Sequence, residues 1–454
     1  MTVGVVALAG QLARGETTSA ALTEQFLARI AERDKTLNSF ITATADAARA
    51  MAADSDRRRA AKISLGPLDG IPIALKDNID LAGVATTAGI EARRKRVSAT
   101  DAVVTARLKA AGAVILGKLN MHEGAHGATT ANDAYGYCFN PHRAGYTPGG
   151  SSGGSGAAVA AGLCAAALGT DTLGSIRIPA AFCGIAGIKP TRGLVSARGV
   201  VPLAWSLDHV GPMAPKVADL AVMLEAIAGG DSGDPVSATP PVPFDFSLRD
   251  TGSLKGLRIG RVAIDDSCDA DVAAGYEAAL TVLQKLRAEI VTADLDGYDH
   301  AALRPKALLV IEADLALIHA DDLEKTPTGF TQVFRDGVEF GRKQSAPKLA
   351  AAIEAIRNVR PIAARLFGAV DALVTPTTPT PAFSFKSPMP KTITAFTAFA
   401  NYAGAPAVSV PMGLTRERLP MGLQVTCRPF ADMTALRIAI GYEQAAGWDM
   451  RPPE

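Results

Sequence analysis

Short strand-like runs alternate with helix-like segments along this chain, and that alternation constrains its fold more than any other feature. Residues 71–75, IPIAL, are β-like, and residues 103–112 predict a helix that leads into a strand at 113–120. The order strand, helix, strand returns between residues 257 and 295. Strands that alternate with helices favour an α/β fold class over an all-helical or all-β one.

Other segments fill in this outline. Residues 3–60 have helical periodicity, as do residues 215–230 and most of 301–368. The Ala/Gly-rich stretch Gly153 to Gly169 is interpreted as one helix packed tightly in the core, since it is too short and too rich in small residues to cross a bilayer. Near the C-terminus, residues 405–414 and 421–430 are predicted to be paired strands.

The domain prediction is a single unit over residues 1–454. Its main sequence motifs lie within 66–214, and a variable helical region covers about 300–400. A Pro-rich polar segment near 231–246 predicts a surface linker, either a domain boundary or a loop that crosses one large sheet.

Composition narrows the class of partner. Lys and Arg number 46 and Asp and Glu 45, so the formal net charge is +1 and no basic field suited to a phosphate backbone is visible. We therefore expect no nucleic-acid partner and no membrane association. Five cysteines without a C-x-x-C pair indicate free thiols in a reducing compartment, and the N-terminus does not resemble a signal peptide, so the expected location is the cytoplasm.

Chemistry concentrates in the stretch from Pro148 to Thr191 and in one lysine upstream of it. Two glycine-rich turns carry Ser151/Ser152 and Ser175, and no histidine lies between them. A serine needs a base before it can attack, and Lys76, at the end of an apolar run, would have a lowered pKa if buried. This combination points to amide cleavage by Lys and Ser, although most lysines are exposed and idle.

Each serine turn has a plainer interpretation as well. Gly150 to Gly154 matches the G-x-S-x-G elbow of α/β-hydrolases, but the preceding residues are poor strand formers, so a helix N-terminus capped by serine is favoured. Ser175 could likewise cap a helix. In the functional interpretation, the backbone N–H groups of Thr172 to Ser175 point into a common cavity and form an oxyanion hole.

Metal and nucleotide chemistry are disfavoured. His122 to His126 spell H-E-x-x-H, but Gly124 weakens the helix that a zinc site needs and no third ligand is evident. The glycine-rich turn also lacks the Gly-Lys-Ser/Thr ending of a P-loop. We expect no metal and no cofactor.

Taken together, these segments resemble the amidase signature family over nearly the whole chain. The resemblance is carried by GPLDGIPIALKDN at 66–78, GKLNMHEGAHG at 117–127, and TPGGSSGGSGAAVAAG with GTDTLGSIRIPAAFCGIAGIKPTRG further on. SLDHVGPMA at 206–214 and the C-terminal FANYAGAPAVSVPMG are similar too. The fold implied by the resemblance is a central mixed twisted sheet flanked by helices on both faces.

The resemblance also implies roles for individual residues. Ser175 matches the acylated nucleophile, and Ser151 matches a bridging serine whose preceding peptide bond is typically cis. Lys76 matches the terminal base of this Lys-cisSer-Ser triad. The backbone at Thr172 to Ser175 would stabilise the oxyanion, Ala125 would line the acyl pocket, and Asp171 and Arg177 would support the site without reacting. The H-E-x-x-H is then incidental.

One position departs from the family pattern. Relatives usually have Gly where this chain has Leu173, and a glycine would allow positive φ and a close approach of substrate. We expect the Leu173 side chain to reach the pocket mouth and to alter substrate choice. Trp205, Phe330 and Phe334 are candidate wall residues, although ordinary core positions are favoured for them.

The predicted function is that of a free-standing amidase acting on small or aryl amides, with esters and carbamates as further candidate substrates. The alternatives are the amidase subunit of a tRNA-dependent amidotransferase and a non-catalytic binding protein on the same fold. The expected partner is a small-molecule amide. A homodimer is also considered, because dimers are common among soluble enzymes.

Overall fold

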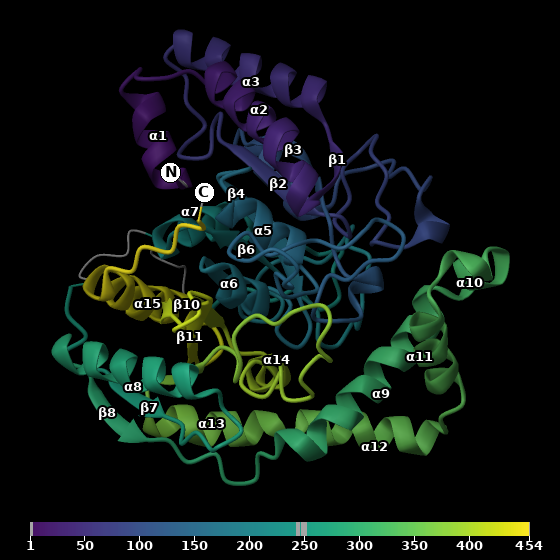
Figure 1. Ribbon diagram of the computed structural model, residues 1–454, viewed down its shortest axis with the longest axis vertical. Helices are drawn as coiled ribbons and strands as arrows, with labels where there is room; N and C mark the ends of the chain where they lie inside the picture. The colour runs from purple at the N-terminus through teal and green to yellow at the C-terminus, as the bar shows by residue number, and fades with distance from the viewer. Residues whose placement is uncertain (1–2, 242–245, 247–251, 454) are drawn as a thin grey trace.

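The computed structural model describes residues 3–241, 246 and 252–453 (Figure 1). Within these residues, eleven strands form one sheet in the order β1-β3-β2-β4-β6-β5-β10-β11-β9-β7-β8. The strands are β1 (Phe40–Ala43), β2 (Pro72–Lys76), β3 (Val114–Leu119), β4 (Ala166–Asp171), β5 (Ala186–Lys189), β6 (His209–Ala214), β7 (Arg258–Arg261), β8 (Glu289–Thr292), β9 (Ala372–Pro376), β10 (Ala407–Leu414) and β11 (Pro420–Cys427).

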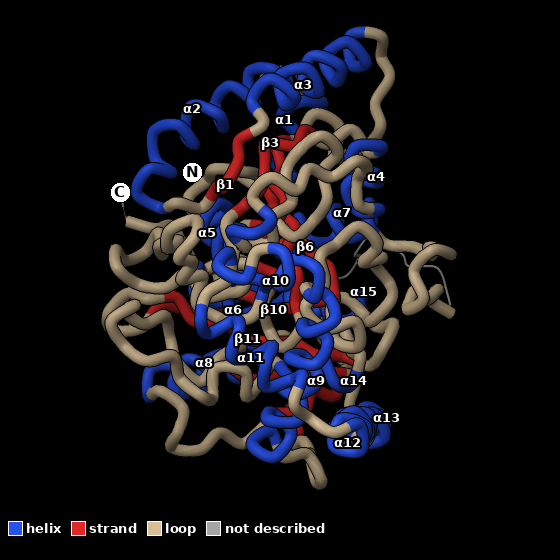
Figure 2. Tube along the Cα trace, turned by 90° about the vertical axis from the view of Figure 1, so that its right-hand side faces the viewer, coloured by secondary structure: helices blue, strands red, loops and turns tan. Residues whose placement is uncertain are grey.

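The sheet is mixed. Strand β2 runs parallel to β3 and β4, and β7 runs parallel to β8 and β9, whereas the remaining neighbours are antiparallel. The antiparallel pair β10 and β11 confirms the two strands predicted near the C-terminus. Helices cover both faces of the sheet, as the two perpendicular views show (Figures 1 and 2), so the α/β architecture is confirmed.

The helices that cover the sheet follow the chain in order. They are α1 (Val5–Ala13), α2 (Ser19–Leu37), α3 (Ala45–Ala60), α4 (Val103–Ala110), α5 (Gly153–Ala160), α6 (Arg177–Cys183), α7 (Val217–Ile227), α8 (Ala270–Lys285), α14 (Ala398–Ala403) and α15 (Asp432–Ala446). Helices α9 (His300–Ile318), α10 (Ala320–Lys325), α11 (Gln332–Arg342) and α12 (Ala346–Arg357) extend outward to the right in Figure 1, and α13 (Val359–Ala369) returns to β9.

Two helix predictions were wrong. The stretch Gly153 to Gly169 is not one helix: α5 ends at Ala160, Gly162 takes a positive φ of 69°, and the chain re-enters the sheet as β4. Alanine and glycine carry no periodic pattern, so helix and strand could not be told apart there. Residues 3–60 also contain the short strand β1, which pairs with the edge of β3.

The segment near 231–246 lies partly outside the described residues. Its described part is held against the loop between β5 and β6: Asp231 accepts hydrogen bonds from Ser196 and Arg198, at 2.7 and 2.9 Å. Strands from both sides of this segment belong to the same sheet. The helices of the variable region end at Ala369, where β9 begins the return to the sheet.

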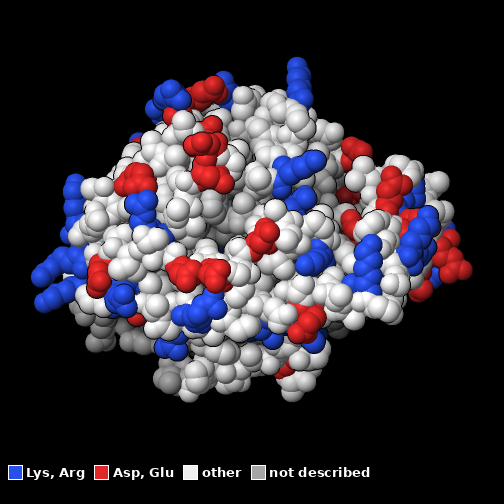
Figure 3. Space-filling view, turned by 90° about the horizontal axis from the view of Figure 1, so that it is seen from below, with Lys and Arg blue, Asp and Glu red and all other residues white. Residues whose placement is uncertain are grey.

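The surface shows no large patch of one charge on the face that is lowest in Figure 1, where Lys and Arg alternate with Asp and Glu (Figure 3). None of the helices in the described part of the chain is long and apolar enough to cross a membrane.

The pairing of β2 with β4 brings several candidate site residues to the same edge of the sheet. Leu75 lies opposite Leu168 in parallel register, so the next residues of both strands emerge at the same edge of the sheet. Carboxyl ends of parallel strands are where α/β proteins usually bind ligands. Lys76 ends β2 there, and Thr170 and Asp171 end β4 beside it.

Candidate active site

Lys76 is one of the fully buried residues of the predicted site. Every residue of β2 is buried, and the Lys76 side chain has no solvent exposure. Its Nζ lies 2.7 Å from Ser151 Oγ and 2.7 Å from Thr170 Oγ1. The strand therefore delivers an amine to two hydroxyl groups in the interior of the molecule.

Burial governs the protonation of that amine. Desolvation lowers the pKa of Lys76 to about 7, and the negative charges of Asp208 and Asp171 oppose the shift. A lysine with this pKa is a mixture of ammonium and neutral amine near neutral pH. Only the neutral amine can accept a proton, so the site provides a usable base.

Ser151 lies on a tightly fitted loop. The Gly150–Ser151 peptide bond is cis, as the resemblance predicted. A Cβ on Gly150 would lie 2.6 Å from the Thr129 nitrogen, so only glycine fits there. The carbonyl of Ser151 accepts a hydrogen bond from His122 N at 3.1 Å. These contacts hold the fully buried Ser151 against Lys76.

Ser152 has a different place in the site. Its Oγ lies 3.2 Å from the Thr170 carbonyl and 3.3 Å from the Thr170 nitrogen, so it fastens the loop to the end of β4. No strand precedes this serine, and α5 begins directly after it. The hydrolase elbow is therefore wrong, and the predicted helix N-terminus is confirmed, but the Ser152 side chain does not cap it.

Ser175 stands closest to solvent among the three residues. Its side chain is half-buried, whereas Ser151 and Lys76 are fully buried. The two serine loops touch through the Ser175 carbonyl, which accepts a hydrogen bond from Ser152 N at 3.2 Å. The structure has no hydrogen bond between the Ser151 and Ser175 hydroxyls, so proton relay between them is a proposal.

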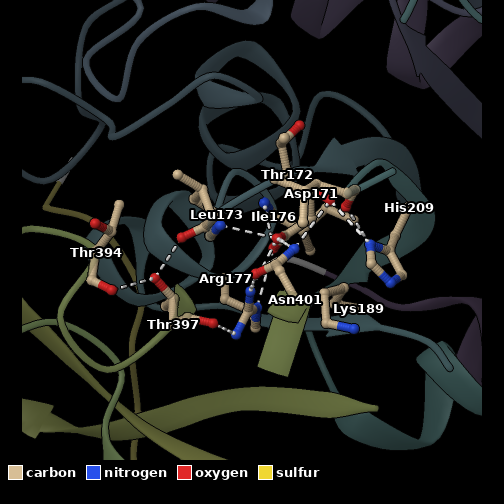
Figure 4. Close-up of polar contacts among 12 residues, drawn as sticks. Asp171, Thr172, Leu173, Ile176, Arg177, Lys189, His209, Thr394, Thr397 and Asn401 are labelled. Carbon is tan, nitrogen blue, oxygen red and sulfur yellow. Dashed lines mark hydrogen bonds and ion pairs between the residues drawn. The ribbon is translucent and has the colours of Figure 1, made fainter. Parts of the chain in front are cut away.

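Asp171 organises the turn that carries Ser175 (Figure 4). Its carboxylate accepts hydrogen bonds from Gly174 N at 2.8 Å and from Ile176 N at 3.1 Å. Arg177 forms a buried, two-point ion pair with the same carboxylate, at 2.9 and 3.0 Å. Burial opposes ionisation of Asp171, but the charge of Arg177 and the hydrogen bonds from Arg177 and Asn401 together outweigh it, so the pKa of Asp171 lies well below its ordinary value.

Arg177 in turn fastens the turn to distant parts of the chain. It donates to the Thr397 carbonyl, to Gln424 Oε1 and to Asn401 Oδ1, at 2.8, 2.7 and 2.6 Å. Figure 4 shows Asp171 and Asn401 converging on the guanidinium group. Sequence predicted Asp171 and Arg177 as supports, and the structure brings them together directly beneath the Ser175 turn.

Hydrogen bonds within this turn limit which backbone N–H groups could stabilise an oxyanion. The N–H of Gly174 is already donated to Asp171, so Gly174 shapes the turn and supplies no free donor. Its φ of 137° and a Cβ that would lie 2.5 Å from Thr397 Oγ1 explain why glycine is needed. No acceptor within the described residues engages the N–H groups of Leu173 and Ser175. These two, with Thr172, are the remaining candidates for an oxyanion hole.

Leu173 does not occupy the backbone conformation that a glycine would serve. Positive φ falls on Gly174 instead. The Leu173 side chain is half-buried and packs against a hydrophobic cluster that includes residues of α9, α11 and α14, while its carbonyl accepts from Thr397 Oγ1 at 2.6 Å. The side chain is thus held between the Ser175 turn and the helical region.

The His122–His126 segment adjoins the Ser151 loop without forming a zinc site. Glu123–Ala125 is one 3₁₀ turn with positive φ at Gly124 and Ala125, so the two histidines do not share a helix face. Glu123 is engaged by Thr331, through its N–H at 3.0 Å and its hydroxyl. No group of three metal-binding side chains lies within the described residues.

Burial also keeps the two histidines neutral. It lowers the pKa of His122 to about 3 and the pKa of His126 to about 4. Near neutral pH neither ring carries a charge, so neither competes electrostatically with Lys76. His126 faces Glu312 of α9 at 3.8 Å.

Of the candidate wall residues, Phe330 and Phe334 are core. They stack on each other at 5.3 Å between ring centroids and are nearly fully buried. Trp205 is 51% exposed, and its backbone N–H donates to the Asp314 carboxylate of α9 at 3.1 Å. Trp205 therefore sits on the surface of the loop that precedes Asp208.

Sequence reasoning assigned no role in this site to three of its residues: Thr170, Asp208 and Asn401. Asp208 accepts from Thr172 Oγ1 at 2.6 Å, and burial raises the pKa of Asp208 to about 6. Asp208 lies in the segment SLDHVGPMA and Thr170 in GTDTLGS, so their positions in the family-like segments were the available signal. Asn401 lies in the family-like segment FANYAGAPAVSVPMG, but its contact with Asp171, 230 residues away in the sequence, could not be predicted from that position.

Comparison with known proteins shows which family this chain is similar to. The sequence profile of the family described as Amidase matches residues 21–436. A glutamyl-tRNA(Gln) amidotransferase subunit from Thermosynechococcus vestitus is 38% identical to this chain, and the alignment covers 98% of each.

Solved structures agree with the sequence comparison. The native peptide amidase of Stenotrophomonas maltophilia superposes with a TM-score of 0.89 at 33% identity and covers 99% of this chain and 98% of its own. A chain from a vestigial protein complex that reveals the origins of an s-triazine catabolic enzyme has a TM-score of 0.91 at 35% identity, covering 98% of this chain and 99% of its own.

Proposed function

The chain belongs to the amidase family, and on that premise we propose that it cleaves the C–N bond of amides through an acyl-enzyme on Ser175. The observation that carries the proposal is the fully buried Lys76 amine, which lies 2.7 Å from Ser151 Oγ and has a pKa lowered to about 7 by burial. Purified wild-type protein that releases no amine or ammonia from any amide in a broad panel would contradict it.

The proposed acylation begins with two proton transfers that end at Lys76. Neutral Lys76 accepts the Ser151 proton while Ser151 accepts the Ser175 proton, and Ser175 Oγ attacks the amide carbonyl carbon. Negative charge gathers on the carbonyl oxygen, where the N–H groups of Leu173 and Ser175 would receive it.

Breakdown of the tetrahedral intermediate, which completes acylation, returns a proton to the substrate. The proton on Lys76 passes back along the serines to the amide nitrogen, which leaves as an amine or as ammonia once it is protonated. Water then attacks the Ser175 ester, aided by the same relay, and the carboxylic acid departs. No cofactor takes part in this scheme.

The proposed chemistry could be carried out within a multi-subunit complex or by a free-standing enzyme. The curated relatives are named as subunits of glutamyl-tRNA(Gln) amidotransferases and span nearly the whole chain, which favours work within a complex over the free-standing amidase predicted first. The peptide amidase structures support the free-standing setting.

Assay of the purified chain alone separates the two. A free-standing enzyme would hydrolyse amides at ordinary rates, of about 1–10³ per second, without a partner. A component of a complex would be slow by itself and faster in a complex recovered from its own cells. The panel should include primary carboxamides such as glutamine, aryl amides, esters and carbamates, read by mass spectrometry.

The rate of hydrolysis should depend on the protonation of Lys76. Below pH 7 the ammonium form predominates and cannot accept a proton, and above pH 7 the neutral amine predominates. We expect kcat/KM to rise with pH and to reach half of its plateau near pH 7. Assays between pH 5 and 9 check this, with samples returned to pH 8 to show that the loss is reversible. A flat profile, or one that falls with pH, contradicts the assignment.

Leu173 should influence which amides are accepted. Its side chain fills space between the Ser175 turn and the helical region, and its backbone needs no glycine. Leu173→Gly should therefore keep the catalytic groups and enlarge the mouth, which raises kcat/KM for bulky amides relative to small ones, on the order of 10-fold. The measurement is kcat/KM over the amide panel. An unchanged ranking of substrates would refute a role in selection.

A further inference from the structure

We propose that Thr170 is a positioning residue of the reaction, because its hydroxyl turns the lone pair of neutral Lys76 toward Ser151. The inference rests on the proposed function, since it concerns the base of that mechanism. It gives a role to a residue outside the Lys-Ser-Ser triad, in direct contact with the base.

The geometry begins with the two parallel strands. Lys76 ends β2 and Thr170 lies near the end of β4, and the register Leu75 to Leu168 brings their side chains to the same edge. Lys76 Nζ has two oxygen neighbours at equal distance, Ser151 Oγ and Thr170 Oγ1, both at 2.7 Å. Both hydroxyls are buried, so bulk water does not compete for the amine.

A neutral amine must treat these two neighbours differently. It carries two N–H donors and one lone pair, and only the neighbour facing the lone pair can give up a proton to it. If the lone pair faces Thr170, then Ser151 is not deprotonated and the relay stops. If an N–H group faces Thr170, the lone pair is free for Ser151.

Asn78 favours the productive arrangement. Its Nδ2 lies 3.2 Å from the Val201 carbonyl and 3.2 Å from Thr170 Oγ1. A carbonyl only accepts, so the amide nitrogen must face Val201, and this orientation also aims an N–H at Thr170. Thr170 Oγ1 accepts from Asn78 with one lone pair, and in the proposed arrangement its other lone pair receives an N–H of Lys76.

The backbone of Thr170 is held by the loop that carries the bridging serine. Ser152 Oγ lies 3.2 Å from the Thr170 carbonyl and 3.3 Å from its nitrogen, and Ser152 follows Ser151 directly. The distance between Thr170 and Ser151 is therefore set by one short, buried segment. After proton transfer, Thr170 and Ser151 both accept from the ammonium of Lys76, so Thr170 also stabilises the charged form.

The sign of the expected pH effect follows. Removing an acceptor from the ammonium disfavours the charged form and lowers the pKa of Lys76. The other charged or titratable groups near the amine are Asp171 on β4, Asp208 before β6 and His122 after β3. All three are kept in the variants below, so a difference between variants reports on Thr170.

The experiment compares Thr170→Val, which keeps the shape of the side chain, with Thr170→Ser, which keeps the hydroxyl. The readout is the rate at which phenylmethylsulfonyl fluoride labels Ser175 between pH 5 and 9, followed by intact mass and located by peptide mass. We expect Thr170→Val to slow labelling by about 100-fold, within the range for general-base effects, and to move the midpoint to lower pH by about one unit. Thr170→Ser should stay within about 5-fold of wild type and keep its midpoint.

Thr23→Val is the matched control. Thr23 is a fully buried threonine on α2 whose hydroxyl has no hydrogen-bond partner among the described residues, so this variant should label like wild type. The inference is overturned if Thr170→Val keeps the wild-type rate and midpoint, or if Thr170→Ser is as slow as Thr170→Val.

Labelling needs no amide substrate, so failure of the inference and failure of the proposed function are distinguishable. Wild-type protein that labels at Ser175 but hydrolyses no amide would refute the function alone. Wild-type protein that is not labelled at Ser175 refutes both.

Discussion

Ser175→Ala is expected to lower kcat for amide hydrolysis by about 10⁴-fold or more, the scale of loss when a nucleophile is removed from an enzyme of this kind. Ser175 is the only one of the three triad residues that is half-exposed, and its side chain makes no hydrogen bond to the supporting network of Asp171 and Arg177. Loss of its Oγ should therefore abolish chemistry and leave the fold intact. Steady-state assays, together with the thermal unfolding midpoint, check both parts.

The matched control is Ser155→Ala. Ser155 is a buried serine on α5 that donates to the Leu168 carbonyl at 3.0 Å, away from the amine of Lys76. Its loss should cost about 1 kcal/mol of stability and leave kcat within about 5-fold, since it touches no reacting group. Turnover by Ser175→Ala at a rate near that of Ser155→Ala would refute the mechanism.

Lys76→Met should have the second-largest effect. Methionine fills a similar volume but offers no proton acceptor, so we expect kcat to fall by about 10³-fold, within the range of general-base contributions. The rise of kcat/KM through pH 7 should disappear, because the group that titrates there is gone. The measurement is the pH profile of both proteins between pH 5 and 9.

Folding should survive this change. Burying an amine costs free energy that an apolar side chain does not, so the unfolding midpoint of Lys76→Met should not fall below that of wild type. Lys109→Met is the control, because Lys109 lies on α4 and pairs with Asp101 at 2.7 Å, remote from β2's end. A Lys76→Met enzyme that keeps the inflection near pH 7 would show that another group is the base.

Much of the fold could be predicted from local pattern. The apolar run at 71–75 became the buried strand β2, and the segments 405–414 and 421–430 became the antiparallel pair β10 and β11. These segments are periodic or uniformly apolar and are bounded by turn residues, which is where sequence is most informative. The prediction failed between Gly153 and Gly169, where small residues fit a helix and a strand equally well.

Some residues of the candidate site could also be predicted from the sequence, and others could not. Lys76, Ser151 and Ser175 stood out because lysine and serine can act as a base and as nucleophiles. The structure brings Lys76 and Ser151 into contact. Thr170 did not stand out, because a threonine has many ordinary uses and only the pairing of β2 with β4 brings it to the amine. The engagement of the Gly174 N–H by Asp171 is likewise a property of the folded turn.

The central claim is that Ser175, activated by Lys76 through Ser151, becomes acylated. The most direct test is to react the protein with a slowly hydrolysed aryl ester, quench it in acid and map the acyl mass by peptide mass spectrometry. The account predicts a single acyl group on the peptide at Ser175, formed far more slowly in Lys76→Met. Acylation at Ser151, at Ser152 or at a residue outside this site, or a rate that is unchanged in Lys76→Met, would contradict it.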